Sequence, residues 1–168
     1  VGQALADIAA TLGFEVTIVD DRADCASAER FPRAAQRIVG EIETELRRMV
    51  IDERTYVVVV TRGHRHDGKA LAAVLHAPAK YVGLIGSKRK VMTIFQDLLA
   101  QGADLDALCR VRAPVGLEIG AVTVPEIALS IAAEIVAVRR GRDDAPANPM
   151  KFDPHRLRDL LTKNASPT

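Results

Sequence analysis

The chain has 168 residues, of which 48% are hydrophobic and 27% are charged, and its formal net charge is +1. These values are typical of a globular domain and give no electrostatic reason to expect nucleic acid or an anionic membrane as a partner. No apolar run is long enough to span a membrane, and Cys25 and Cys109 are too few for a disulfide framework. We therefore expect a cytoplasmic protein with no nucleic-acid or membrane partner.

The sequence opens with an alanine-rich helix over Gln3–Leu12, which Gly13 ends. A short buried strand over Phe14–Val19 follows and leads into Asp20. Helix, glycine, strand and acid in this order are typical of the second half of a nucleotide-binding βαβ unit. In such a unit Gly2 would be the third glycine of the phosphate-binding turn, with a strand before it. We therefore predict that the sheet lacks its first strand in this chain.

The next elements alternate between strands and helices. The patterns predict strands over Gln36–Val39, Thr55–Thr61 and Lys80–Ile85, and helices over Glu41–Met49, Asp67–His76 and Asp104–Cys109, with a further helix that Ser87 caps and that runs to about Ala100. The run TYVVVVT is continuous, as expected for a parallel strand covered on both faces. This alternation predicts a Rossmann-like α/β fold, a doubly wound parallel sheet in a three-layer αβα arrangement.

The last long helix has the clearest local signals. Thr123 and Glu126 have the capping-box spacing, and Gly141 can end the helix in the left-handed conformation. Apolar residues recur from Ile127 at three and four residue steps, and Leu129 widens this stripe. We predict one domain over residues 1–141, followed over 142–168 by a linker and a tail with a short helix.

Ligands of open α/β sheets bind beyond the carboxyl ends of the strands, so the turns between strand and helix are the candidate sites. At the first turn Gly2 can offer backbone amides to a phosphate, or it can serve only the close packing of helix and strand. Asp20 lies where a ribose hydroxyl would be accepted, although acids after strands also cap the next turn.

Two further turns carry polar side chains. Thr61, His64, His66 and Asp67 follow one strand, and their spacing matches no dedicated metal pattern. Asp67 is well explained as a helix N-cap, which leaves His64 as the better candidate for ligand contact.

Another strand is followed by Gly86, Ser87, Lys88, Arg89 and Lys90. Three cations in a first helical turn oppose the helix dipole unless an anion binds there. We favour a phosphate site over a solvated surface at this turn. No pattern of a known catalytic or metal-binding motif occurs, so no residue is assigned to either role.

Four stretches together are distinctive: VGQALADIAATLGFEVTIVDDR, VVVVTRGHRHDGKAL, YVGLIGSKRK and APVGLEIGAVTVPEIALSIAAEIVAVRRG. In this order they resemble the Rossmann-like domain of the XdhC/CoxI family, and the resemblance covers nearly all of residues 1–141. The chain departs from the family pattern at Arg62, where many members have histidine, and at Glu118, where most have aspartate.

The resemblance implies an accessory protein, a chaperone that binds the molybdenum cofactor. Such a protein would assist sulfuration of the cofactor with a cysteine desulfurase and its insertion into a molybdenum hydroxylase apo-enzyme of the xanthine dehydrogenase type. The cofactor-binding residues would be Gly2, Asp20, Thr61, His64, Asp67, Gly86, Ser87, Lys88, Arg89, Gly116, Glu118 and Gly120. The glycines at 116 and 120 suggest a backbone that passes close to another group, as a wall over the ligand.

Two alternatives stay open. The first is an NAD(P)-dependent oxidoreductase, with His64 or Tyr81 as proton donor. The second is a nucleotide-binding interaction module without catalysis. A homodimer is also considered, because a sheet without its first strand can take one from a neighbour.

Overall fold

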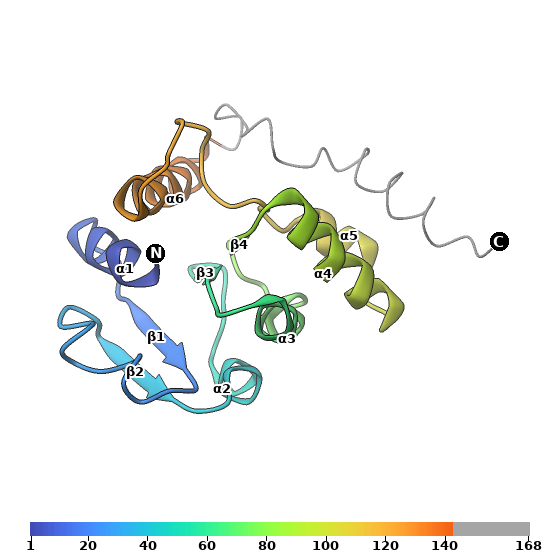
Figure 1. Ribbon diagram of the computed structural model, residues 1–168, viewed down its shortest axis with the longest axis horizontal. Helices are drawn as coiled ribbons and strands as arrows, with labels where there is room; N and C mark the ends of the chain where they lie inside the picture. Colours follow the sequence, from blue (N-terminus) through green and yellow to red (C-terminus); the bar gives the residue numbers. More distant parts are fainter. Residues whose placement is uncertain (143–168) are drawn as a thin grey trace. The chain divides into compact units, whose positions relative to one another are not determined.

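The computed structural model describes residues 1–142. Their elements, drawn in Figure 1, are α1 (Gly2–Thr11), β1 (Thr17–Asp20), β2 (Gln36–Val39), α2 (Ile42–Arg48), β3 (Tyr56–Val59), α3 (His64–Val74), β4 (Tyr81–Leu84), α4 (Lys88–Ala100), α5 (Leu105–Cys109) and α6 (Val124–Arg139). The strands form two parallel pairs, β1 with β2 and β3 with β4. The α/β class with parallel strands, predicted from the sequence, is confirmed.

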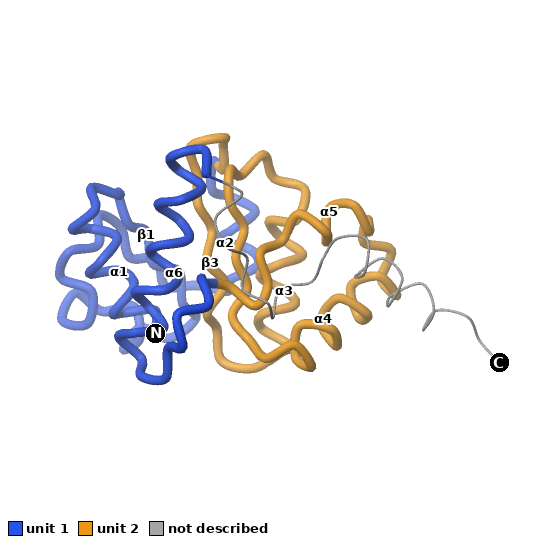
Figure 2. Tube along the Cα trace, turned by 90° about the horizontal axis from the view of Figure 1, so that it is seen from above, with its two compact units in different colours: residues 1–50, 116–146 blue, residues 51–115, 147–168 orange. Residues whose placement is uncertain are grey.

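The described residues form two compact units, which Figure 2 colours separately. The first unit combines residues 1–50 with the described part of residues 116–146, and the second contains residues 51–115. Both units fall within the range that the sequence assigned to a single domain. The short helix expected in the tail lies outside the described residues.

In the first unit β1 lies parallel to β2, with Thr17 opposite Gln36. β1 begins later than predicted, at Thr17 rather than at Phe14. The amide of Phe14 donates to the carbonyl of Ala9 (3.0 Å), so the chain is still closing the end of α1 at this point. This hydrogen bond explains why the strand starts later than the sequence pattern predicts.

The core of the first unit includes a residue that the polar loop over 23–33 supplies. Phe31 is 9% exposed and packs with Ala6 and Ala34, and the partly buried Val16 and Ile18 lie against this cluster. The aromatic side chain of Phe31 therefore joins the loop to the core.

α1 and α6 pack against each other, although they lie at opposite ends of the described chain (Figure 1). Arg139 of α6 donates from Nη1 to the carbonyl of Leu12 (3.1 Å), just after α1. Its guanidinium lies 4.7 Å from the centroid of the Phe14 ring. A cation at this place suits the negative end of a helix and the face of an aromatic ring.

The buried face of α6 differs from the predicted stripe at three positions. Leu129 was expected to widen the face but is 53% exposed, whereas Ser130 and Glu134 are buried. The hydroxyl of Ser130 donates to the carbonyl of Ile127 (2.8 Å), and Glu134 accepts the amide of Gly116 (2.6 Å). At Ser130 and Glu134 the prediction was wrong because it placed only apolar residues on the buried face, whereas hydrogen bonds allow polar groups to be buried as well.

α6 begins with the predicted capping box. Oε2 of Glu126 accepts hydrogen bonds from the amides of Thr123 (2.8 Å) and Val122 (2.9 Å). These backbone hydrogen bonds hold the pKa of Glu126 below its usual value of 4.5. After the helix, Gly141 has the predicted left-handed conformation, with φ of 68°.

We expect Glu126→Gln to lower the melting temperature at neutral pH and to have little effect at acidic pH. The folded-state pKa is lowered, so the carboxylate stabilises the fold above the unfolded-state pKa, and this contribution is lost as the pH falls through the folded-state pKa. Melting curves of the two proteins between pH 7 and about pH 3 should therefore converge. A difference that stays constant over this range would show that the charge of Glu126 is not the cause.

In the second unit β3 lies parallel to β4, with Tyr56 opposite Tyr81. Arg112, which follows α5, makes a further parallel bridge to Gly83 of β4. Both strands are shorter than predicted: β3 ends at Val59 rather than at Thr61, and β4 ends at Leu84 rather than at Ile85. The carboxyl ends of the two strands thus lie at one edge, as in every parallel pair.

The helices of the second unit each bury one apolar face. The nearly fully buried side chains are Leu71 and Val74 of α3, Val91, Ile94, Phe95 and Leu98 of α4, and Leu108 of α5. Leu99, next to Leu98, is only partly buried. Burial of large apolar side chains on α3 and α4 fixes the positions of the two helix starts that follow β3 and β4.

Candidate functional site

The strongest candidate site lies at the carboxyl ends of β3 and β4. We define the β3–β4 edge as residues 61–67, which lead into α3, and residues 85–90, which lead into α4. Parallel pairing places both segments at the same edge. The edge therefore brings together seven of the predicted site residues: Thr61, His64, Asp67, Gly86, Ser87, Lys88 and Arg89.

α3 begins earlier than predicted, and this changes the role of Asp67. The helix starts at His64, after Gly63 with φ of 84°, so the prediction that Asp67 is the N-cap is wrong. Asp67 lies within the helix and is fully buried. Its Oδ1 accepts hydrogen bonds from the amide (3.1 Å) and the hydroxyl (2.7 Å) of Thr61. Asp67 therefore organises the loop that precedes its own helix.

The start of α4 is as predicted. Ser87 is the N-cap, and its hydroxyl oxygen accepts the amide of Lys90 (3.3 Å). Ser87, Lys88 and Arg89 are exposed. With the amide of Lys90 taken by the cap, the other amides of the first turn can bind an anion, and two cationic side chains flank them.

Lys90 was counted among the three cations of this turn but was not assigned to the site. The structure gives it a distinct partner, because its ammonium group contacts Oδ2 of the buried Asp67 and its side chain is 27% exposed. The pair joins the two halves of the β3–β4 edge. No local pattern could have found it, since the two residues lie in different helices.

The two histidines of the edge begin α3. His64 is exposed and His66 is partly buried. Within residues 1–142, no three side chains of the metal-binding types His, Cys, Asp and Glu come together as a candidate metal site. His64 thus lies where it could contact a ligand at the edge as a single side chain, and not as part of a metal-binding cluster.

In the first unit Asp20 ends β1, and its carboxylate is held by Arg22. Oδ1 accepts the amide and Nε of Arg22 (both 3.0 Å), and Oδ2 accepts Nη2 (3.1 Å). Burial by itself would raise the pKa of Asp20, but the hydrogen bonds from Arg22 outweigh it and hold the pKa below its usual value. A ribose hydroxyl would have to compete with Arg22 for the Asp20 carboxylate. Gly2, which was also predicted as a site residue, is the first residue of α1.

The glycine-rich run before α6 is also in the first unit. Gly116 has φ of 101°, and an added Cβ would lie 2.5 Å from Oγ of Ser130 in α6. The backbone does pass close to another group at this residue, and that group is α6. Gly120 has φ of 70° with open space around it, and its amide donates to Glu118 (3.0 Å).

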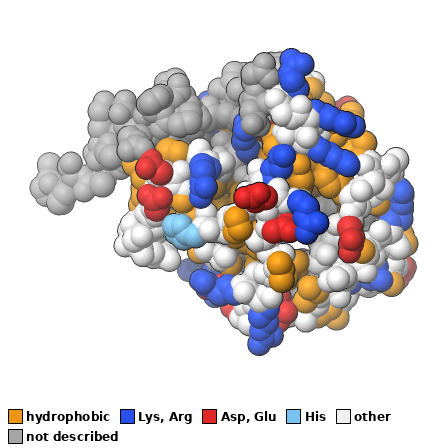
Figure 3. All heavy atoms as spheres, turned by 180° about the vertical axis from the view of Figure 1, so that it is seen from behind, with side chains coloured by type: hydrophobic (Ala, Val, Ile, Leu, Met, Phe, Trp, Pro, Cys, Tyr) orange, Lys and Arg blue, Asp and Glu red, His pale blue; other side chains and the backbone are white. Residues whose placement is uncertain are grey.

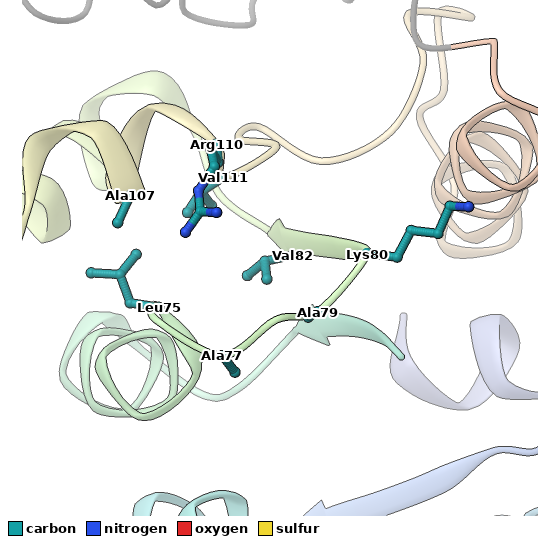
Figure 4. A pocket seen from close by; sticks show the side chains of 8 residues that line it. All are labelled: Leu75, Ala77, Ala79, Lys80, Val82, Ala107, Arg110 and Val111. Atoms are coloured by element: carbon teal, nitrogen blue, oxygen red, sulfur yellow. The ribbon is translucent and has the colours of Figure 1, made fainter. Parts of the chain in front are cut away.

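A small pocket lies near the other end of β4. It encloses about 100 Å³, whereas pockets for small-molecule ligands typically hold about 300–1,000 Å³. Figure 4 shows Leu75, Val82 and Ala107 around it and Lys80 pointing away. Ala79 and Lys80 precede β4, so this pocket is not at the β3–β4 edge, and it is too small for a pterin or a nucleotide.

Tyr81 lies at the start of β4 and is 2% exposed. Burial raises the pKa of Tyr81 well above that of an ordinary tyrosine, and the nearby Arg112 offsets this only in part. A buried and weakly acidic hydroxyl is a poor proton donor. This observation disfavours the oxidoreductase alternative in the form that relied on Tyr81.

The surface shows no single dominant charge on the face drawn in Figure 3, where acidic and basic side chains are intermixed. Such mixing agrees with the formal net charge of +1. Among the described residues, no helix has the length and apolar character that crossing a membrane requires.

Residues 1–135 match the family model of the XdhC Rossmann domain. Among solved structures, a xanthine dehydrogenase from Bacillus halodurans is similar with a TM-score of 0.72 and 29% identity, over 85% of this chain and 40% of that chain. The family match and this structural likeness together confirm the Rossmann-like fold predicted from the sequence.

Two curated proteins are also similar. The uncharacterized protein YqeB of Escherichia coli strain K12 is 31% identical over 156 residues, which cover 92% of this chain and 28% of YqeB. A probable xanthine dehydrogenase subunit of Bacillus subtilis strain 168 is 30% identical over 136 residues, which cover 81% of this chain and 39% of that protein. The chain thus spans well under half the length of these relatives.

Proposed function

Because this chain belongs to the XdhC Rossmann-domain family, we propose that it is an accessory protein that binds the molybdenum cofactor and assists its sulfuration and its insertion into a molybdenum hydroxylase of the xanthine dehydrogenase type. The names of two relatives, one a probable subunit of xanthine dehydrogenase and the other a xanthine dehydrogenase of known structure, support the link to that enzyme. In this proposal a cysteine desulfurase supplies the sulfur, and the apo-hydroxylase receives the cofactor.

The start of α4 is the observation that carries the cofactor-binding part of the proposal. A phosphate needs donors and positive charge, and the first turn of α4 has amides flanked by the exposed Lys88 and Arg89. The cofactor carries a phosphate or a nucleotide, so this donor set fits its anionic end. His64, on the other half of the β3–β4 edge, would be the side chain that contacts the rest of the cofactor. When bound, the cofactor supplies the metal chemistry, and the chain's residues hold its anionic group.

A charge change at the N-cap of α4 tests the proposal. Ser87→Asp keeps a residue that caps helices well but adds a negative charge beside the phosphate position. We expect it to weaken binding of the molybdenum cofactor to the purified protein by about tenfold, the effect of one unfavourable charge contact near 1.4 kcal/mol. Equilibrium titration with isolated cofactor measures the affinity.

Ser87→Asn is the matched control, because it caps the helix equally well without a charge. It should bind the cofactor nearly as well as the wild type does. Equal binding by wild type and Ser87→Asp would remove this turn from the site.

Titrations with NAD(H) and NADP(H) separate the alternatives. Binding of the nicotinamide nucleotides without cofactor binding would favour the oxidoreductase. Binding of neither class would leave the interaction module.

A further inference from the structure

Lys90 makes three separate contacts that fix the turn between β4 and α4. Its amide donates to the hydroxyl oxygen of Ser87 (3.3 Å), and its ammonium group contacts Oδ2 of Asp67. Its aliphatic stem lies over Gly86, where an added Cβ would be 2.9 Å from Cδ of Lys90. One residue thus touches the cap, the glycine before it and the neighbouring helix.

Asp67 carries the connection to the other half of the edge. It is fully buried, and its other carboxylate oxygen, Oδ1, accepts both the amide and the hydroxyl of Thr61. A continuous chain of contacts therefore runs from Thr61 through Asp67 and Lys90 to Gly86 and Ser87.

The burial of Asp67 determines which role Lys90 can have. A buried carboxylate is costly without a partner, so a ligand that drew Lys90 away would leave an uncompensated charge in the protein. The side chains of Lys88 and Arg89, by contrast, are exposed. The three cations of the turn therefore divide into two exposed ones, which flank the amides, and one that holds the turn.

We propose that Asp67 and Lys90 are positioning residues, which hold the amides at the start of α4 in the direction that binds the phosphate of the ligand. The identity of that ligand rests on the proposed function, whereas the ordering of the turn does not. The pair acts through Ser87 and Gly86 and does not touch the phosphate.

Amide hydrogen exchange tests the positioning without a ligand. Lys90→Met keeps the aliphatic stem over Gly86 but removes the charge, and we expect exchange at residues 85–90 to become about tenfold faster, as for a segment that opens locally more often. Lys90→Arg should restore slow exchange, because it restores the ion pair. Lys80→Met, at the other end of β4, is the matched control and should leave this segment unchanged.

Affinity for the molybdenum cofactor separates positioning from direct contact. With positioning, Lys90→Met weakens binding by about tenfold, comparable to the smaller losses seen when the hydrogen-bond partners of metal ligands are removed. Asp67→Asn, which releases Lys90, also weakens binding. With direct contact, Asp67→Asn would strengthen binding, because the freed ammonium group would turn to the phosphate.

Unchanged exchange in Lys90→Met, or tighter binding by Asp67→Asn, would overturn the inference. If Asp67→Asn does not fold, Lys90→Met and Lys90→Arg still decide it. If the wild type binds no cofactor, the proposed function fails, and the exchange rates alone decide whether the pair holds the turn.

Discussion

Replacing Asp67 with alanine is expected to lower the free energy of unfolding by about 3 kcal/mol, the lower end of the range for breaking a buried ion pair. The substitution leaves the amide and hydroxyl of Thr61 without their acceptor and Lys90 without its counter-charge. Lys90 is 27% exposed, so its ammonium group can turn toward water, which limits the loss. Urea denaturation followed by circular dichroism measures the difference.

A double-mutant cycle of Asp67→Asn and Lys90→Met isolates the pair. Asparagine keeps an acceptor for Thr61, so Asp67→Asn should be less damaging than Asp67→Ala. We expect a coupling energy of about 1–2 kcal/mol between the two positions. Additive effects would mean that the interaction between Asp67 and Lys90 contributes nothing to the free energy of unfolding.

Gly116→Ala should be nearly as destabilising, with a loss of about 3 kcal/mol from backbone strain and overpacking together. The positive φ of 101° disfavours any side chain, and the new Cβ would lie 2.5 Å from Oγ of Ser130 and 3.4 Å from the amide nitrogen of Ile131. Ser130 and Ile131 are buried in α6 and have little room to move. The same denaturation experiment measures this loss.

Gly120→Ala is the matched control for Gly116. Its φ of 70° is also positive, but no atom lies within 4 Å of the added Cβ. We expect a loss of about 1 kcal/mol from the backbone alone. Adding Ser130→Ala to Gly116→Ala should recover part of the difference. Equal losses at both glycines would show that the close approach to α6 has no energetic weight.

The parts of the fold set by neighbours in sequence were predicted well. Ser87 caps α4, and Thr123 and Glu126 begin α6, because each signal acts within one helical turn. The start of β1 and the N-cap of α3 were placed wrongly. In both cases a backbone hydrogen bond at a helix end lies beyond the expected boundary: Phe14 to Ala9 at the end of α1, and Asp67 to Gly63 at the start of α3.

At the candidate site, the residue types were predictable but their partners were not. The Asp20–Arg22 pair has a local signal, since Asp52 and Arg54 have the same spacing and likewise form three hydrogen bonds elsewhere in the chain. The Asp67–Lys90 contact has none, because packing of α3 on α4 creates it. The burial of Glu134 had no local signal either, because a polar residue of an amphipathic helix is ordinarily expected to face solvent.

The packing of α1 on α6 determines when the first unit can be completed during synthesis. α1 leaves the ribosome before α6, which follows only after the whole of residues 51–115 has been made. At ordinary rates of translation this delay is on the order of ten seconds. A helix of 10 residues is marginal by itself, so during that interval the face of α1 that packs on α6 has no permanent cover. The described part of the second unit is continuous in sequence. The nascent chain can therefore fold this part before α6 of the first unit has been made.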